Sequence, residues 1–291
     1  MKNNNNFPII NLDTNKLGSI LSENIEIRKS ISYLGKIDDL KPNPNTLTFA
    51  NNLEYYLKAQ EKGFDFILYN QHIDENDSTI FSKNPHKDFL KVVKWLNENG
   101  EYSRLKRSVS KKVAIGENVK IGNNVVINDG VKIGNNVVIE DNSYIDKNVV
   151  IDDFVKIGGF GFDFAIDDQI QLAGLHGGVY IGENSIVKSF TNIDGSLWGL
   201  NTMIGSNVAI DSHVLIGHDV FIENNVQIRG GSIIGGFSQI GENSIIGIGS
   251  KFLQRTKLGK NSLTSANAII SKNYKENSKI VSQPSKVFKN D

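Results

Sequence analysis

Aliphatic residues recur every six positions through much of the chain. Isoleucines stand at this interval from Ile115 to Ile157, and a valine usually lies two positions before each one. Gly, Asn, Asp or Glu follows each of these isoleucines. After a pause, the step of six resumes at Ile181 and, following a slip of one residue, continues from Ile204 to Ile270. Such a step matches neither the roughly 3.6-residue period of an α-helix nor a heptad.

The hexads predict a stack of short strands. The β-branched residue before each isoleucine favours extended backbone, and side chains along a strand alternate between its two faces. Gly, Asn and Asp tolerate the left-handed backbone that a sharp corner needs. Each hexad is then one strand and one corner. Residues 112–272 are therefore predicted to form a β-solenoid whose core is a column of aliphatic side chains.

The solenoid has one long interruption. The repeat pauses over residues 158–178, which begin with the sequence Gly-Gly-Phe-Gly-Phe. Loops on a rigid scaffold often carry function. We therefore expect a loop excursion at this place that contributes to the functional site.

Residues 1–105 lack the six-residue repeat, and their sequence predicts a small α/β domain. Asn52 stands before a helix predicted over 53–62, as a capping residue does. Residues 64–69 (FDFILY) predict a strand. A second helix, opened by a proline and followed by a glycine, is predicted over 86–99.

Composition narrows the possible functions. The 291 residues suggest about two domains. Lys+Arg and Asp+Glu both number 32, so the chain lacks the excess of positive charge that is usual in proteins that bind nucleic acid. Because there is no cysteine, disulfides, thiolate zinc sites, iron–sulfur clusters and cysteine nucleophiles are impossible. No apolar run approaches the length of a membrane span, so we expect a cytoplasmic protein.

The hexads resemble those of the hexapeptide-repeat acyltransferases. This resemblance implies a mainly β fold, a left-handed parallel β-helix in which three hexads make one coil. The small N-terminal α/β domain would precede it. The resemblance also implies a homotrimer with active sites between neighbouring subunits, and the length of the repeat implies about eight coils.

The segment of residues 47–55 (LTFANNLEY) resembles one in the UDP-3-O-acylglucosamine N-acyltransferases of lipid A synthesis. There the N-terminal domain holds the uridine, and Phe49, Asn52 and Tyr55 match the base-binding positions in type and spacing. An aromatic ring can stack on a pyrimidine, and an amide can read its edge as donor and acceptor. Residues 1–105 are therefore predicted to bind a nucleotide.

Among the five histidines, His218 matches the position of the family's catalytic histidine. It follows an Ile-Gly pair, which predicts a solenoid corner with the side chain facing outward. An amine that attacks a thioester must lose a proton, and imidazole titrates near neutrality. Gly236 lies 18 residues further on, and the resemblance implies that its backbone N–H stabilises the thioester oxygen. Asp194 matches a family position near the histidine and is predicted to orient the imidazole.

Other residues complete the predicted substrate-binding set. The resemblance implies that Phe160 and Phe162, in a Gly-Phe-Gly type of motif, contact the substrate. His176 and His213 belong to the same predicted set. Arg255 joins them because it falls where the family has a further histidine.

Two departures from the lipid A enzymes favour another donor and acceptor. Residues 195–199 (GSLWG) replace their Arg-Gly-Ala-Leu-Asp-Asp run, where a sugar and an acyl chain would lie. Residues 273–291 predict a C-terminal tail that resembles the end of hexapeptide acyltransferases, without the long helices that engage acyl carrier protein. We therefore expect an N-acyltransferase that uses acyl-CoA as co-substrate, with no permanently bound cofactor or metal. Its acceptor would be a dTDP- or UDP-linked amino sugar destined for surface polysaccharide.

Three alternatives remain open. The first is the lipid A enzyme itself, with acyl carrier protein (ACP) as the donor. The second is a γ-type carbonic anhydrase, because His176, His213 and His218 could supply three zinc ligands, although the N-terminal domain and the tail argue against it. The third is a scaffold without enzymatic activity.

Overall fold

A computed structural model of the chain describes residues 10–23, 25–27, 29–35, 37, 42–73, 79–99, 106–159, 161, 164–166, 170–172, 177–197 and 202–283. These residues form two compact units. The first contains the described residues up to 99, those between 161 and 177, and Leu197; the second contains 106–159, 178–196 and 202–283. Within the described residues, no helix is long and apolar enough to cross a membrane.

The first unit is built on a four-stranded parallel sheet whose strands follow sequence order. The strands are β1 (Tyr33–Leu34), β2 (Thr46–Phe49), β3 (Phe66–Tyr69) and β4 (Thr79–Phe81). The helices are α1 (Thr14–Leu21), α2 (Leu53–Glu61) and α3 (Pro85–Glu98). Helix α3 packs on β2 and β3, and its apolar stripe is fully buried: Phe89, Val92, Val93 and Leu96.

Local sequence explains the two predicted helices. The Asn52 side chain accepts the Tyr55 N–H at 2.9 Å and caps α2. Asn84 accepts the Lys87 N–H at 3.2 Å and does the same for α3. Both helices begin and end within one residue of the prediction. The strand predicted over 64–69 corresponds to β3. Helix α1 and strands β1, β2 and β4 were not predicted, and these strands, of two to four residues, offer little alternation to detect.

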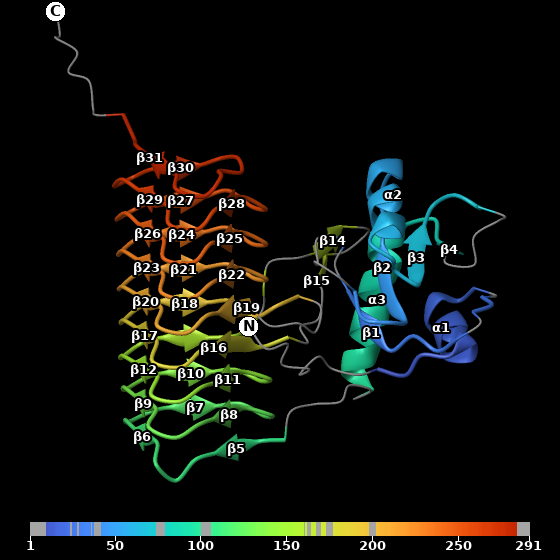
Figure 1. Ribbon diagram of the computed structural model, residues 1–291. Helices are drawn as coiled ribbons and strands as arrows, with labels where there is room; N and C mark the ends of the chain where they lie inside the picture. Colours follow the sequence, from blue (N-terminus) through green and yellow to red (C-terminus); the bar gives the residue numbers. More distant parts are fainter. Residues whose placement is uncertain are drawn as a thin grey trace, which may run out of the picture. The chain divides into compact units, whose positions relative to one another are not determined.

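The second unit is a left-handed parallel β-helix with three flat faces (Figure 1). Face 1 contains β5 (Ser108–Val109), β8 (Val126–Ile127), β11 (Tyr144–Ile145), β16 (Val179–Ile181), β19 (Thr202–Ile204), β22 (Phe221–Ile222), β25 (Gln239–Ile240) and β28 (Lys257–Leu258). Face 2 contains β6 (Ala114–Ile115), β9 (Lys132–Ile133), β12 (Val150–Ile151), β17 (Ile186–Val187), β20 (Ala209–Ile210), β23 (Gln227–Ile228), β26 (Ile245–Ile246), β29 (Leu263–Thr264) and β31 (Lys279–Ile280). Face 3 contains β7 (Lys120–Ile121), β10 (Val138–Ile139), β13 (Lys156–Ile157), β18 (Asn192–Ile193), β21 (Leu215–Ile216), β24 (Ile233–Ile234), β27 (Lys251–Phe252) and β30 (Ile269–Ile270).

The register follows the six-residue step. Ile139 pairs with Ile121 on one side and with Ile157 on the other, so neighbouring strands lie 18 residues apart. The faces hold eight, nine and eight strands, which confirms both the predicted fold class and the expected number of coils. The second residue of nearly every strand points inward, and these isoleucines and the valines before them form the continuous core.

Corners between the faces use left-handed backbone, usually at asparagine. The asparagine edge joins faces 1 and 2 and includes Asn207, Asn225, Asn243 and Asn261. The aromatic edge joins faces 2 and 3 and includes Phe154, Phe190 and His213. The histidine edge joins faces 3 and 1 and includes His218, Asp219, Gly236, Phe237 and Arg255.

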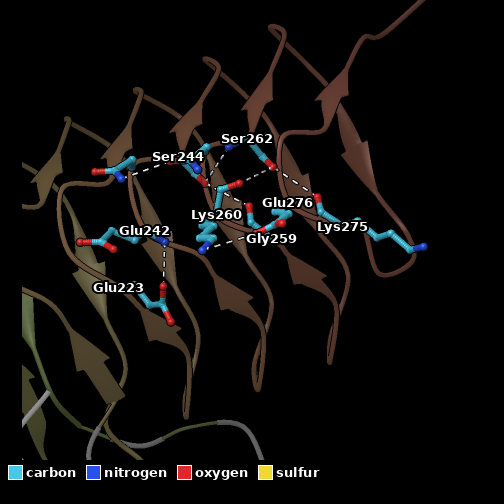
Figure 2. A network of polar contacts seen from close by, with 10 residues as sticks. Glu223, Glu242, Ser244, Gly259, Lys260, Ser262, Lys275 and Glu276 are labelled. Atoms are coloured by element: carbon cyan, nitrogen blue, oxygen red, sulfur yellow. Dashed lines mark hydrogen bonds and ion pairs between the residues drawn. The ribbon is translucent and has the colours of Figure 1, made fainter.

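Polar contacts repeat between coils at the asparagine edge, and Figure 2 shows those of the last coils. Ser262 donates its backbone N–H to the Ser244 hydroxyl at 3.2 Å. Lys260 and Glu276 form an ion pair at 3.5 Å. The coils near the C-terminus are therefore held by hydroxyl and charged groups at their corners as well as by the aliphatic core.

The β-helix extends past both predicted bounds. It begins at Ser108, which pairs with Val126, and it continues to β31, which pairs with β29. The tail predicted from residue 273 therefore starts after Ile280. The step of six fails between Ile270 and Ile280, which hid this last coil from the sequence pattern. Strand β13 ends at Ile157 and β16 begins at Val179, and the antiparallel pair β14 (Phe164–Ile166) and β15 (Ile170–Leu172) lies between them in the sequence.

Candidate active site

His218 lies at the histidine edge, directly after β21 and one glycine. The sequence predicted an outward-facing side chain, yet only 7% of it is exposed. The reason is packing by the next coil. Gly236 packs on the imidazole, and the Phe237 ring meets it edge-on with centroids 4.9 Å apart. The imidazole is thus a corner group that its own coil and the next one enclose.

Asp219 binds the imidazole. Its Oδ2 lies 2.9 Å from His218 Nδ1, and its side chain is fully buried. The Ser196 hydroxyl donates to Oδ1 at 2.5 Å, and Asp219 N–H donates to the Thr202 hydroxyl at 2.8 Å. Because an ionised carboxylate only accepts hydrogen bonds, Nδ1 carries the proton and Nε2 is left with its lone pair. This tautomer suits a general base.

Asp194, which the sequence predicted to orient the imidazole, makes no hydrogen bond to it in the structure. Asp194 accepts a hydrogen bond from Asn192 at 2.7 Å, and the carboxylate on His218 Nδ1 belongs to Asp219. Burial holds the pKa of Asp194 above its ordinary value. The Asn192 hydrogen bond and the charges of Lys156 and His218 act in the opposite direction and are outweighed by burial. Asp194 is therefore a nearby half-buried carboxyl group and not the partner of the imidazole.

Sequence reasoning missed Asp219 because adjacent residues on a strand point to opposite faces. At this corner the backbone of Asp219 is left-handed, with φ of 61°. This conformation turns its side chain back toward the preceding residue. A His-Asp pair at a hexad corner was the signal that could have found it.

We expect Asp219→Asn to lower kcat on the order of 10²-fold with KM little changed. The Asn amide can donate to His218 Nδ1, which forces the proton onto Nε2 and removes the base. Initial rates across pH would measure this. Ser196→Ala, which removes one hydrogen bond to Asp219, is the milder control. An Asp219→Asn protein with more than half the wild-type kcat would contradict the assignment.

Gly236 lies one coil above His218, as the 18-residue spacing predicted. A Cβ atom at Gly236 would stand 2.7 Å from both His218 Cε1 and Nε2, so no side chain fits there. Among the described residues, no group accepts a hydrogen bond from the Gly236 N–H. The corner therefore places a main-chain donor beside the ring that carries the base.

Arg255 and Phe237 continue the histidine edge. The Arg255 guanidinium carbon lies 4.3 Å from the centroid of the Phe237 ring. Arg255 N–H donates to the Gly236 carbonyl at 3.0 Å, which fixes its place two coils above Asp219. Of the two predicted substrate-binding residues that the structure describes in the second unit, Arg255 lies at the histidine edge and His213 does not.

The nucleotide-binding candidates lie in the first unit. Phe49 ends β2 and is half-buried, with its ring 5.0 Å from those of both His86 and Phe89. Asn52 is exposed, and its carbonyl oxygen is used to cap α2. Tyr55 lies on the first turn of α2, and Lys58 Nζ is 5.8 Å from its ring centroid.

Four predicted substrate-binding residues remain. Phe160, Phe162 and His176 lie outside the described residues. His213 lies at the aromatic edge, where its ring stacks on Phe190 at 5.0 Å. In the described part of the chain, no three His, Cys, Asp or Glu residues gather as metal ligands would.

Comparison with known proteins agrees with this architecture. The family model for bacterial transferase hexapeptide repeats (six repeats) matches residues 112–147. The second unit therefore carries hexapeptide repeats of the bacterial transferase type. No curated protein matches the sequence.

Solved structures show the same likeness. A UDP-N-acetylglucosamine acyltransferase from Francisella novicida is 28% identical, with a TM-score of 0.43, over 56% of this chain and 60% of its own. A second UDP-N-acetylglucosamine acyltransferase is 22% identical, with a TM-score of 0.50, over 60% of this chain and 69% of its own. PerB from Caulobacter crescentus, in complex with CoA and GDP-perosamine, is 12% identical, with a TM-score of 0.20, over 79% of this chain and 73% of its own. The chain thus spans 60% of the Francisella enzyme, and the likeness to the second structure shows a shared β-helix fold.

Proposed function

We propose that the protein is an N-acyltransferase that moves an acyl group from a thioester, preferably acyl-CoA, to the amino group of a nucleotide-linked amino sugar. One observation carries the proposal: the buried His218–Asp219 pair lies beside Gly236, whose N–H has no acceptor among the described residues. A base and a main-chain donor at one corner are what aminolysis of a thioester requires.

In the proposed reaction, His218 Nε2 takes a proton from the amine as its nitrogen attacks the thioester carbonyl carbon. The carbonyl oxygen becomes negatively charged, and the Gly236 N–H donates to it. Asp219 stabilises the imidazolium that forms, since its carboxylate accepts from Nδ1. The C–S bond then breaks, the amide is formed, and the imidazolium returns its proton to the departing thiolate.

The first unit supports the nucleotide part of the proposal. Phe49, Asn52 and Tyr55 follow one another at the carboxyl end of β2 and the start of α2. Ligands of open parallel sheets bind at the carboxyl ends of the strands. The Asn52 oxygen is used by the helix cap, and its amide nitrogen remains a donor for a carbonyl of the base. A pyrimidine nucleotide fits this set.

Positive charge along the histidine edge supports a phosphate-bearing donor. Residues 251–283 contain seven Lys or Arg and one Glu, in a chain without net charge. Lys272 occupies the register of His218 three coils further on, about 14 Å away at the roughly 4.8 Å spacing of strands. Lys251 and Lys257 flank the edge on faces 3 and 1. None of these three lysines has an ion pair with a described residue. The phosphates of coenzyme A would match this charge.

The aromatic edge supports a homotrimer. Phe154 is 50% exposed and Phe190 is 54% exposed, and their rings stack at 5.0 Å. Exposed aliphatic residues flank them on faces 2 and 3: Ile186, Leu215, Ile233, Leu263 and Ile269. A long apolar strip on a rigid solenoid favours burial against other copies of the chain.

The function is tested by incubating the full chain with an acyl-CoA and a panel of UDP- and dTDP-linked amino sugars. Thiol release and the mass of the amide product are measured together. Failure to acylate any of them would reject the proposal. Faster turnover with acyl-ACP than with acyl-CoA would instead favour the lipid A type of enzyme.

The donor site has its own test. We expect replacement of Lys251, Lys257 and Lys272 by Gln to raise KM for acyl-CoA by about tenfold or more, since charge-assisted contacts to phosphate are lost. Acyl-pantetheine lacks the phosphates, so its KM would not change. Lys279→Gln, which alters a lysine on face 2, is the matched control. Equal effects of the triple and control variants would show that the cluster does not bind the donor.

A further inference from the structure

The corners of the histidine edge have left-handed backbone, and an aromatic residue, Phe237, occupies one of them. Phe237 has φ of 61°, in the left-handed region that favours Gly, Asn and Asp. On the asparagine edge, the same kind of corner is occupied by Asn207, Asn225, Asn243 and Asn261. An aromatic residue is strained in this conformation, and such strain is retained where it serves a site. Phe154 and Phe190 have the same backbone on the aromatic edge, where their rings stack on each other, so the reason for a Phe at position 237 is sought in the contacts of its ring.

The contacts of Phe237 supply that reason. Its ring meets the His218 imidazole edge-on, at 4.9 Å and an interplanar angle of 86°. The Arg255 guanidinium lies over the same ring at 4.3 Å. Phe237 N–H also donates to the His218 carbonyl at 3.0 Å, which ties the two corners together. Imidazole, phenyl ring and guanidinium thus form a chain of contacts along three successive coils.

Each neighbour restrains the imidazole in a different way. Asp219 holds Nδ1, and Gly236 packs on the imidazole without a side chain to displace it. Phe237 meets the imidazole edge-on at 4.9 Å, a contact that opposes rotation of the imidazole about its χ2 bond. The cation–π contact with Arg255 holds the phenyl ring in turn.

We propose that Phe237 is a positioning residue, kept in a strained conformation to hold the His218 imidazole with Nε2 in one direction, and that Arg255 holds Phe237 in place. This inference rests on the proposed role of His218 as a base. In this inference Arg255 has a structural role, contact with the Phe237 ring, which is separate from any contact with substrate. A base that swings by about 1 Å loses much of its rate advantage.

The decisive variant is Phe237→Asn. Asn suits left-handed backbone, so we expect the Tm to stay the same or rise. We expect kcat to fall about 10- to 100-fold, with KM for donor and acceptor unchanged. Phe237→Tyr keeps the ring and is expected to restore near wild-type kcat. Asn261→Gly, a corner change on the asparagine edge, is the control and should leave kcat unchanged.

A second readout does not depend on turnover. In protein labelled with ¹⁵N-histidine, the Nδ1–H signal of His218 should be sharp in the wild type and in Phe237→Tyr, and broadened in Phe237→Asn. A fall in Tm with unchanged kcat and an unchanged Nδ1–H signal would mean that Phe237 is merely structural, which would overturn the inference. If no substrate is turned over, the NMR result still decides the positioning role, while the proposed function alone has failed.

Discussion

Replacement of His218 by Asn is expected to lower kcat by about 10³-fold, within the usual range for loss of a general base. The Asn amide nitrogen can take the place of Nδ1 and donate to Asp219, whose side chain is fully buried. The variant should therefore fold, and KM should change little. Measured kcat across pH, with Tm determined in parallel, separates loss of the base from loss of structure.

His218→Ala is the companion variant. It leaves the Asp219 carboxylate buried without its ring partner, so we expect a lower Tm in addition to the loss of kcat. Full activity of His218→Asn at every pH would remove the base from the mechanism. The amino sugar would then pass its proton directly to the thiolate, and the corner would act through the Gly236 N–H.

Gly236→Ala is expected to have the second large effect, a loss of about 10²–10³-fold in kcat. The added Cβ would stand 2.7 Å from His218 Nε2 and Cε1, so either the imidazole or the coil has to shift. Both shifts separate the base from the main-chain donor. Overpacking of this kind also costs about 1–3 kcal/mol of stability, which thermal unfolding would detect.

The double variant Gly236→Ala with His218→Asn tests how the glycine acts. If the added methyl group acts by displacing the imidazole, Gly236→Ala should lower kcat little further once His218 has been replaced by Asn. If the two losses in kcat multiply in full, Gly236 contributes independently of the ring, through its N–H. An unchanged kcat in Gly236→Ala alone would contradict the close packing at this corner.

The fold was predictable because its signal repeats. A single isoleucine predicts no structure. Isoleucine at every sixth position from Ile115 to Ile157 predicts a strand-and-corner hexad and excludes a helix. The cap at Asn52 likewise predicted α2 correctly, because the hydrogen bond that starts a helix is local in sequence. The last coil was missed where Lys279–Ile280 pairs with Leu263–Thr264 out of step with the repeat.

The site was predictable only in part. The spacing of 18 residues placed Gly236 over His218, because the rise of one coil is a property of the repeat itself. Asp219 was overlooked in favour of Asp194, because the direction of a side chain at a corner depends on φ. Phe237 and Arg255 formed no recognisable motif, since their contact with each other links residues 18 apart through ring geometry.

The sequence by itself determined the strand-and-corner solenoid and the corner position of His218, because these follow from periodicity and from the backbone preferences of Ile, Val, Gly and Asn. The three-hexad coil came from the resemblance to the hexapeptide-repeat acyltransferases. Only the tertiary structure decided which carboxylate holds the imidazole, how deeply the imidazole is buried and what packs against it. Those features depend on side-chain directions at left-handed corners and on contacts between coils, and both come into existence only when the coils stack.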